Sequence, residues 1–280
     1  MRPVYPYIGD YPRYVGTSRG QQNYQVGKTV TKPMGHIPQV PFTHGFYDGY
    51  FGLLNDAGLG IAESTCSARI VGALPISQGG AGLWYTDELS RVAMERESDA
   101  RSAVQLMGNL AVKGGYYGGD GENLPGESLI VSDKNEVWVF HILPSDSNGT
   151  SAIWAAQRVP DGHVTVVPNV FVLREIDFND KENFLYSANI QSIAEKNGWW
   201  KQGEPFDFTK IYSGGEYHHR YYSGRRWWGA MKIFAPSQNF PTKYNDWRND
   251  APYPFSVKPD KDVTLEDVMA VMRTFYEGTE

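Results

Sequence analysis

The stretch from Gly52 to Cys66, GLLNDAGLGIAESTC, constrains the fold most strongly, because two short apolar runs flank a turn signal. The turn is Asn55-Asp-Ala-Gly58, whose Asn, Asp and Gly tolerate the backbone angles of a tight reversal. The pattern therefore predicts a β-hairpin. The end of its second strand carries four chemically useful side chains: Glu63, Ser64, Thr65 and Cys66.

Cys66 is the only cysteine in the chain and the first candidate for a nucleophile. A lone thiol beside polar residues at a strand end suggests a hydrolase site. A thiol needs a nearby base or a lowered pKa to attack, however, and the local sequence supplies no base. Free cysteine is also among the most buried residue types. The sequence alone favours a small packed core residue over a nucleophile at this position.

Composition narrows the class of protein. With 280 residues, 41% hydrophobic and 21% charged, the chain can form one large domain or two small ones. The net charge of −6 and the lack of a sustained Lys/Arg stripe argue against nucleic acid or an anionic membrane as partner. The basic cluster Arg220, Arg225 and Arg226 is too short to change this. No apolar run approaches the ~20 residues of a membrane span.

Residues 1–46 are rich in Pro, Tyr and Gly, which disfavours regular helix. Aromatic side chains are costly to leave in water, so this segment is expected to wrap a folded body as ordered loop with short extended pieces. Sheet and helix layers are expected over 50–280. We expect one hydrolase domain over 1–280.

Four strands are predicted after a long helix. The helix is expected to begin with Thr86 as its cap and to run to Leu110, because apolar residues recur at helical spacing. The strands are expected at 128–132, 137–143, 151–157 and 163–169. Short turns between consecutive strands predict an antiparallel meander.

Two further helices are predicted at 181–196 and 265–276. The second begins at Thr264-x-x-Asp267, which resembles a capping box. Helices combined with an antiparallel meander predict an α+β layered fold.

The six histidines give no metal-binding motif, because none forms an HExxH or a Cys/His ligand spacing. No metal or other cofactor is predicted. His218-His219 could contact a substrate, but adjacent histidines in a Tyr-rich loop are more typical of a surface or packing feature.

Two other positions stay open between chemistry and structure. Asn169 follows a predicted strand, so its amide is either a donor at a strand end or a turn residue. Arg225-Arg226-Trp-Trp228 places guanidinium groups beside large aromatics. That arrangement can grip a carboxylate or pack by cation–π contact.

Three segments together resemble the secernin-type dipeptidases, a family of cysteine peptidases among the N-terminal-nucleophile hydrolases. The segments are LLNDAGLGIAEST, the run from GESLIVSDKNEVWVFHILP through SAIWAAQRVPDGHVTVVPNVFVLREIDFNDKENFLYS, and GRRWWGAMKIFAPS. The resemblance covers the chain from about Arg2 to Glu280. It implies an αββα sandwich, with two antiparallel sheets between helical layers, and hydrolysis of dipeptides or related small amides.

In that family the nucleophile is an N-terminal cysteine whose own α-amino group acts as general base, with an ordinary pKa near ~8. No residue of this sequence matches that cysteine. The resemblance therefore implies that the chain is the middle of a longer protein, without the first strands and the C-terminal part of the fold, or is a short paralogue without the nucleophile.

The resemblance also implies roles for individual residues. Thr65 matches a polar residue on the oxyanion side, and Asn169 matches an Asn that donates to the tetrahedral oxyanion. Arg226 matches an Arg that holds the nucleophile region or the substrate. Glu63 and Ser64 flank the same pocket, and Cys66 matches a position that is not the nucleophile.

Two classes of function follow. One is a cysteine-type dipeptidase, active in the complete protein, whose partner is a small peptide substrate. An acyltransfer or deacylating enzyme on the same fold would differ mainly in substrate. The other class is a catalytically inactive paralogue that acts as a binding or scaffold protein. The compartment and the oligomeric state stay open.

Overall fold

The computed structural model describes residues 2–4, 11–16, 33–49, 52–118 and 125–277. Its strands are β1 (Arg2–Val4), β2 (Arg13–Val15), β3 (Gly35–Ile37), β4 (Phe46–Asp48), β5 (Gly52–Asn55), β6 (Gly60–Ala68), β7 (Trp84–Tyr85), β8 (Tyr116–Gly118), β9 (Gly126–Ser132), β10 (Val137–Pro144), β11 (Ala152–Arg158), β12 (Phe184–Tyr186) and β13 (Ser213–Gly215). Its α-helices are α1 (Thr86–Arg96), α2 (Ala100–Gly114), α3 (Ile190–Lys196), α4 (Phe208–Tyr212), α5 (Tyr222–Phe234), α6 (Trp247–Asp250) and α7 (Leu265–Arg273).

One large antiparallel sheet organises the described part of the chain. Its order is β1-β4-β5-β6-β9-β10-β11-β12, and β13 pairs with β6 as a ninth strand. Two small two-stranded sheets, β2-β3 and β7-β8, lie outside it. The predicted α+β class is confirmed. The predicted pair of large sheets is not seen within the described residues, where a single large sheet carries nine strands.

The predicted hairpin is confirmed as β5 and β6. The Asn55 side chain accepts hydrogen bonds from the backbone N–H groups of Ala57 (3.1 Å) and Leu59 (2.9 Å), which closes the turn. Gly58 has a φ of 87°, a left-handed conformation that costs glycine least. The turn residues thus set the register that delivers Glu63 to Cys66 to the centre of the sheet.

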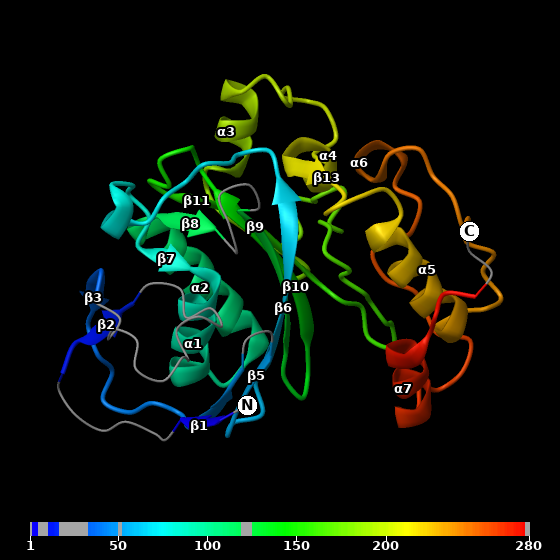
Figure 1. Ribbon diagram of the computed structural model, residues 1–280, viewed down its shortest axis with the longest axis horizontal. Helices are drawn as coiled ribbons and strands as arrows, with labels where there is room; N and C mark the ends of the chain where they lie inside the picture. Colours follow the sequence, from blue (N-terminus) through cyan, green and yellow to red (C-terminus); the bar gives the residue numbers. More distant parts are fainter. Residues whose placement is uncertain (1, 5–10, 17–32, 50–51, 119–124, 278–280) are drawn as a thin grey trace.

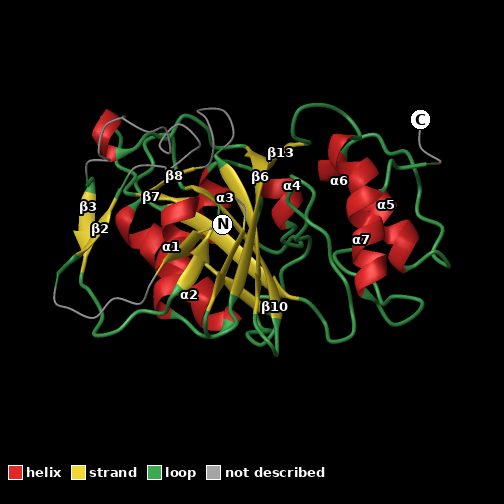
Figure 2. Ribbon diagram, turned by 60° about the horizontal axis from the view of Figure 1, so that its bottom comes forward, coloured by secondary structure: helices red, strands yellow, loops and turns green. Residues whose placement is uncertain are grey.

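Both faces of the sheet are buried, because apolar side chains alternate along its central strands. On β10, Trp138, Phe140 and Ile142 pack toward the cluster that includes α1 and α2. Val139 and Leu143 pack on the opposite face, against residues 159–257. Figures 1 and 2 show α1 and α2 on one side of the sheet and α5 to α7 on the other.

The long helix expected from Thr86 to Leu110 is two helices, and Thr86 is not its cap. Thr86 is the first residue of α1, and its hydroxyl bonds the Tyr116 hydroxyl at 2.6 Å. α1 ends where Glu97 turns to an extended conformation, and the Asn55 amide caps this end by donating to the carbonyls of Met94 and Glu97. α2 then begins at Ala100. Asp99 is its N-cap, and the Asp99 carboxylate accepts from the Ser102 N–H at 2.9 Å.

Three strands of the predicted meander are confirmed as β9, β10 and β11, but the expected strand at 163–169 is wrong. Residues 163–169 contain only an isolated bridge between Val164 and Val257. Asn169 has a φ of 57°, which ends any extended conformation there. The strand next to β11 is instead β12, within the segment where a helix was expected at 181–196. Only the C-terminal half of that helix forms, as α3.

The helix predicted at 265–276 forms over 265–273, as α7. Its capping box is confirmed, since Thr264 and Asp267 exchange side-chain to backbone hydrogen bonds. None of the helices in the described part of the chain has the length and apolarity required to cross a membrane.

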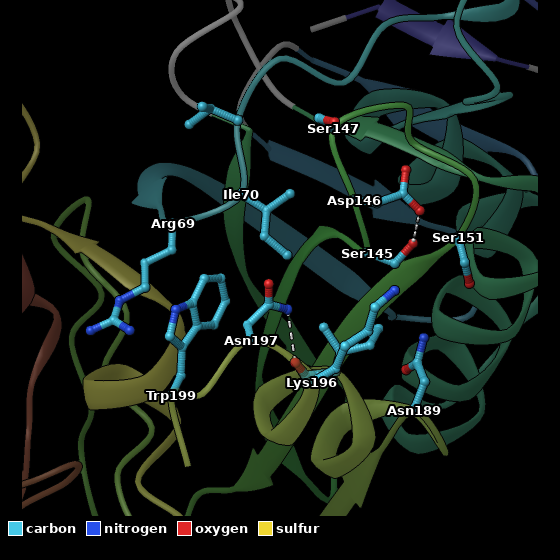
Figure 3. A pocket seen from close by; sticks show the side chains of 12 residues that line it. Arg69, Ile70, Ser145, Asp146, Ser147, Ser151, Asn189, Lys196, Asn197 and Trp199 are labelled. Carbon is cyan, nitrogen blue, oxygen red and sulfur yellow. Dashed lines mark hydrogen bonds between the residues drawn. The ribbon is translucent and has the colours of Figure 1, made fainter.

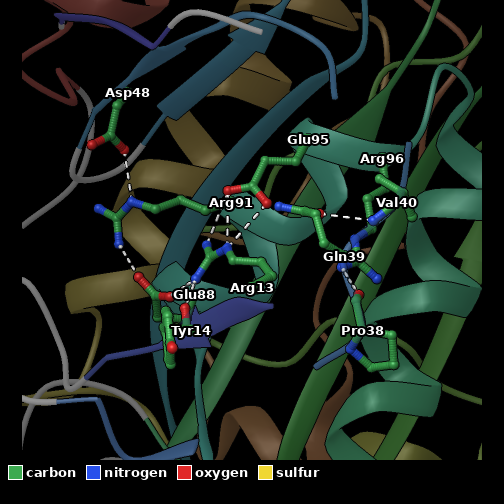
Figure 4. Close-up of polar contacts among 10 residues, drawn as sticks. All are labelled: Arg13, Tyr14, Pro38, Gln39, Val40, Asp48, Glu88, Arg91, Glu95 and Arg96. Carbon is green, nitrogen blue, oxygen red and sulfur yellow. Dashed lines mark hydrogen bonds and ion pairs between the residues drawn. The ribbon is translucent and has the colours of Figure 1, made fainter. Parts of the chain in front are cut away.

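The described part of the N-terminal segment is held to α1 by buried ion pairs. Arg13 of β2 contacts Glu88 at 2.7 Å and Glu95 at 3.0 Å. Arg91 contacts Asp48 of β4 at 2.9 Å and also reaches Glu88 (Figure 4). Of the segment 1–46, for which ordered loop with short extended pieces is expected, the described residues contain β1, β2 and β3, and β4 begins at its last residue. The rest of this expectation concerns residues 1, 5–10 and 17–32, which lie outside the described residues.

Candidate functional site

The candidate site forms where β6 meets an irregular segment after residue 167. The backbone N–H of Asn169 donates to the Ser64 hydroxyl at 2.8 Å, and the Asn169 side-chain amide donates to the Thr65 carbonyl at 2.7 Å. The two residues it bonds are more than 100 positions away in the sequence. The fold therefore brings together Ser64, Thr65 and Asn169.

Arg226 joins the same group from α5. Its guanidinium donates to the Asn169 side-chain oxygen at 2.8 Å and to the Pro168 carbonyl at 2.9 Å. The guanidinium also lies 4.2 Å from the ring centre of Tyr222, a cation–π contact. Its neighbour Arg225 takes no part in these bonds.

This hydrogen bonding assigns the orientation of the Asn169 amide. Because Arg226 can only donate, the atom that it contacts must be the amide oxygen, and the NH₂ group must face β6. One N–H of that group reaches the Thr65 carbonyl. The second N–H has no acceptor among the contacts of the described residues.

Thr65 contributes through its backbone more than through its side chain. Its hydroxyl donates to the Glu63 carboxylate at 3.0 Å. Since side chains alternate along a strand, Thr65 and Glu63 share the face of Ile61, which packs toward α1 and α2. Ser64 and Cys66 lie on the other face, with Asn169. The predicted residues are adjacent, but they divide between the two faces of β6.

Cys66 is fully buried in the core. Burial raises the pKa of its thiol well above the ordinary value, although the hydrogen bond with Ser128 opposes this. Its sulfur lies 3.1 Å from the Ser128 hydroxyl and donates to the Ser64 carbonyl at 3.3 Å. A protonated thiol with no exposed surface is a poor nucleophile. This geometry supports the interpretation of Cys66 as a core residue.

Two residues without a predicted role hold the start of α5. The Glu216 carboxylate accepts from the backbone N–H groups of Tyr221, Ser223 and Gly224 at 3.0 to 3.1 Å. The Ser223 hydroxyl donates to the Asn169 carbonyl at 3.3 Å. Glu216 thus places a negative charge at the helix N-terminus, where the helix dipole favours it. Glu216 lies 5 to 8 positions before the residues that it caps, outside the usual N-cap spacing, so a capping motif does not identify it.

His141 is a buried polar residue near the site for which the sequence predicted no role. It lies at 0% exposure in the middle of β10, between Phe140 and Ile142. A single polar residue inside the apolar run VWVFHILP was the available signal. His218 and His219 are exposed and pack on Tyr222, away from the bonds of Asn169.

A cavity of about 600 Å³ lies beyond the end of β6 and contains none of the predicted site residues. Arg69, Asp146, Asn189 and Trp199 line it, among others (Figure 3). Within the residues that the structure describes, no three His, Cys, Asp or Glu side chains are grouped so that they could hold a metal ion.

Comparison with known proteins identifies the family. The family model described as peptidase family C69 matches residues 55–280. The chain is 27% identical over 226 residues to a probable dipeptidase of Latilactobacillus sakei, covering 80% of this chain and 43% of that protein. It is 22% identical over 218 residues to dipeptidase A of Lactobacillus helveticus, covering 77% and 41%. For a probable dipeptidase B of Streptococcus pyogenes serotype M1, the values are 26% over 254 residues, 87% and 44%.

The chain spans less than half the length of each of these three relatives. The matched region contains Thr65, Asn169 and Arg226, the residues that meet in the structure. With more than half of its residues matched by the family model, the chain belongs to peptidase family C69.

Proposed function

We propose that this chain carries part of the active site of a dipeptidase, with Asn169 as the donor that stabilises the oxyanion. The relatives are named dipeptidases, and membership of peptidase family C69 supports a peptidase function for this chain. The main support for the role of Asn169 is its half-buried side-chain amide. The NH₂ group lies beside β6, and one of its N–H groups has no acceptor among the described residues.

Asn169 suits this task because its donor is fixed before substrate arrives. Arg226 holds the amide oxygen at 2.8 Å, so the NH₂ group cannot rotate away without breaking a charge-assisted hydrogen bond. The same cation draws electron density from the amide and strengthens its N–H groups as donors. A preorganised donor of this kind is worth about 3 kcal/mol of transition-state stabilisation.

The proposed reaction is attack by a cysteine thiolate on the peptide carbonyl of a dipeptide. Negative charge then develops on the carbonyl oxygen, and in this proposal the second N–H of Asn169 donates to that oxygen. Collapse of the tetrahedral intermediate expels the amine of the second residue, and water hydrolyses the acyl-enzyme. The burial and raised thiol pKa of Cys66 argue against it as the attacking group.

As the resemblance implies, the proposed nucleophile is an N-terminal cysteine of a longer protein, activated by its own α-amino group. The αββα sandwich belongs to the same proposal. The described residues form one large antiparallel sheet, so the second sheet of the sandwich belongs to the proposal alone.

The direct experiment uses the full-length gene product that contains these 280 residues. It is incubated with dipeptides, tripeptides and N-acetylated dipeptides, and free amino acids are quantified. We expect release from dipeptides and at least about tenfold slower release from the other two classes, because a dipeptidase must recognise both free termini. Equal cleavage of all three would contradict a dipeptidase. Binding of dipeptides without hydrolysis would favour the inactive paralogue.

A further inference from the structure

The segment 169–173 is buried although it contains no helix or strand. Val170, Phe171, Val172 and Leu173 are at most 2% exposed. Backbone N–H and C=O groups in such a segment need partners, because an unpaired buried donor or acceptor costs about as much as a lost hydrogen bond. Here side chains provide them: the Phe171 carbonyl accepts from Trp247, and the Leu173 carbonyl accepts from Thr209.

His141 provides the partner for two backbone donors of this segment, those of Val172 and Leu173. Its Nε2 atom accepts from the N–H of Val172 at 2.8 Å and from the N–H of Leu173 at 3.2 Å. The ring also packs on Phe171 and Phe208, with centroids 4.8 and 5.7 Å away. An Nε2 atom that accepts cannot carry a proton, so the proton of the neutral ring is on Nδ1.

The Nδ1 atom continues the connection toward β6. It lies 2.6 Å from the Ser128 hydroxyl on β9, and as the protonated nitrogen it donates there. The Ser128 hydroxyl is then free to donate to the Cys66 sulfur at 3.1 Å, and Cys66 donates to the Ser64 carbonyl at 3.3 Å. In this series of hydrogen bonds each group donates to the next one, from His141 on β10 through Ser128 on β9 to Cys66 and Ser64 on β6.

We propose that His141, as the neutral Nδ1–H tautomer, is a positioning residue that fixes the Asn169 segment relative to β6. One ring nitrogen holds the segment three residues after Asn169, and the other leads by Ser128 and Cys66 to Ser64. Ser64 in turn accepts from the Asn169 N–H at 2.8 Å, which closes the loop. The assignment of Asn169 as an oxyanion donor rests on the proposed dipeptidase function. The positioning itself does not depend on it.

His141 is not itself placed to act on a substrate. It has no exposed surface, and each ring nitrogen is occupied within the protein. Burial also lowers the pKa of His141 to about 3, so the ring stays neutral. A histidine that only packs in the core would be equally buried. The experiments therefore test the protonation and hydrogen bonds of the ring nitrogens.

The first experiment reads the tautomer in the unaltered chain by ¹⁵N NMR of the imidazole nitrogens. We expect a protonated Nδ1 and an unprotonated Nε2, unchanged between about pH 5 and pH 8, because the ring is neutral throughout. A protonated Nε2, or titration of the ring within this range, would overturn the proposal. No variant needs to fold for this measurement.

The second experiment measures hydrogen exchange at Val172 and Leu173 in variants of His141. His141→Gln places an amide oxygen near the former Nε2 position, so exchange should stay within about threefold of the unaltered chain. His141→Phe keeps the ring but accepts nothing, so exchange should rise at least about tenfold. His163→Phe is the matched control, because His163 also bonds a serine hydroxyl, that of Ser256, at 3.1 Å. Equal exchange in the Gln and Phe variants would contradict a positioning role.

Kinetics of the full-length gene product complete the test. If it hydrolyses dipeptides, His141→Phe should lower kcat at least about tenfold with KM within about threefold, and His141→Gln should restore most of kcat. Equal losses in both variants would reject the role in catalysis. If no hydrolysis is found, the proposed function fails, and the tautomer and exchange measurements still decide the positioning.

Discussion

Arg226 and Asn169 lie 57 positions apart in the sequence, yet the guanidinium of one holds the amide oxygen of the other at 2.8 Å. This bond determines which way the amide faces, and it directs the NH₂ group toward the Thr65 carbonyl on β6. The orientation of a potential oxyanion donor is thus set by a cation on a different element.

Replacing Arg226 by lysine should lower dipeptide hydrolysis by the full-length gene product about tenfold in kcat. A lysine keeps the charge, but a single ammonium cannot reproduce the planar fork that reaches both the Asn169 oxygen and the Pro168 carbonyl. Arg225→Lys, one position away on the same helix, is the control and should retain activity. Similar losses in the two variants would point to a general effect of helix α5.

Cys66 should be unreactive in the folded chain. Its thiol has a raised pKa and no exposed surface, so alkylation by iodoacetamide at pH 8 should be at least about a hundredfold slower than in denaturant. The rate is measured by mass spectrometry of the intact chain. Rapid alkylation of the native chain, or dipeptide cleavage by the purified 280-residue chain that Cys66→Ser abolishes, would restore Cys66 as a nucleophile. We expect neither.

Asp87 should make the fold less stable at neutral and alkaline pH. Burial raises its pKa to about 7, although Arg91 opposes this. Between the unfolded pKa near ~4 and the folded value, the native state binds more protons than the unfolded state, so this residue increases stability as pH falls. Asp87→Asn should raise the free energy of unfolding at pH 8 by about 1 to 3 kcal/mol, with little effect at pH 4. Urea denaturation at both pH values measures the difference, and equal effects at both would contradict the raised pKa.

Replacing Arg13 should destabilise the fold, because the buried Glu88 carboxylate would lose an ion-pair partner. Its removal would leave Glu88, which is 0% exposed, with Arg91 as its remaining ion-pair partner among the contacts in Figure 4. Arg13→Met should lower the free energy of unfolding by about 3 kcal/mol. Arg101→Met is a suitable control, because among the described contacts that guanidinium reaches two backbone carbonyls and the face of the Trp138 ring, and forms no ion pair. A loss of less than about 1 kcal/mol would show that the N-terminal segment is not held by this network.

Local sequence signals predicted local structure well. The β5-β6 hairpin and the capping box of α7 depend on residues close together in the sequence, and both were predicted. At the break between α1 and α2, the carbonyls of Met94 and Glu97 accept from Asn55, about 40 positions upstream. Helical periodicity continues across that break, so the pattern of apolar residues could not reveal it.

The segment around Asn169 shows why the rest could not be predicted. Its apolar residues are typical of a buried strand, but its backbone bonds go to side chains of His141, Thr209 and Trp247 instead of to a neighbouring strand. Nothing in the local sequence indicates those partners. The resemblance to known dipeptidases singled out Thr65, Asn169 and Arg226, while the structure added His141, Ser128, Ser223 and Glu216 around them.

The role of Asn169 is tested most directly by the kcat of Asn169→Gly in the full-length gene product with a dipeptide substrate. Glycine tolerates the left-handed backbone, where Asn169 has a φ of 57°, and removes the side chain with its carboxamide. We predict that kcat falls about a hundredfold or more, with KM within about threefold, and that the exposed control Asn179→Gly is unaffected. A kcat within about threefold of the unaltered enzyme would show that Asn169 does not stabilise the oxyanion.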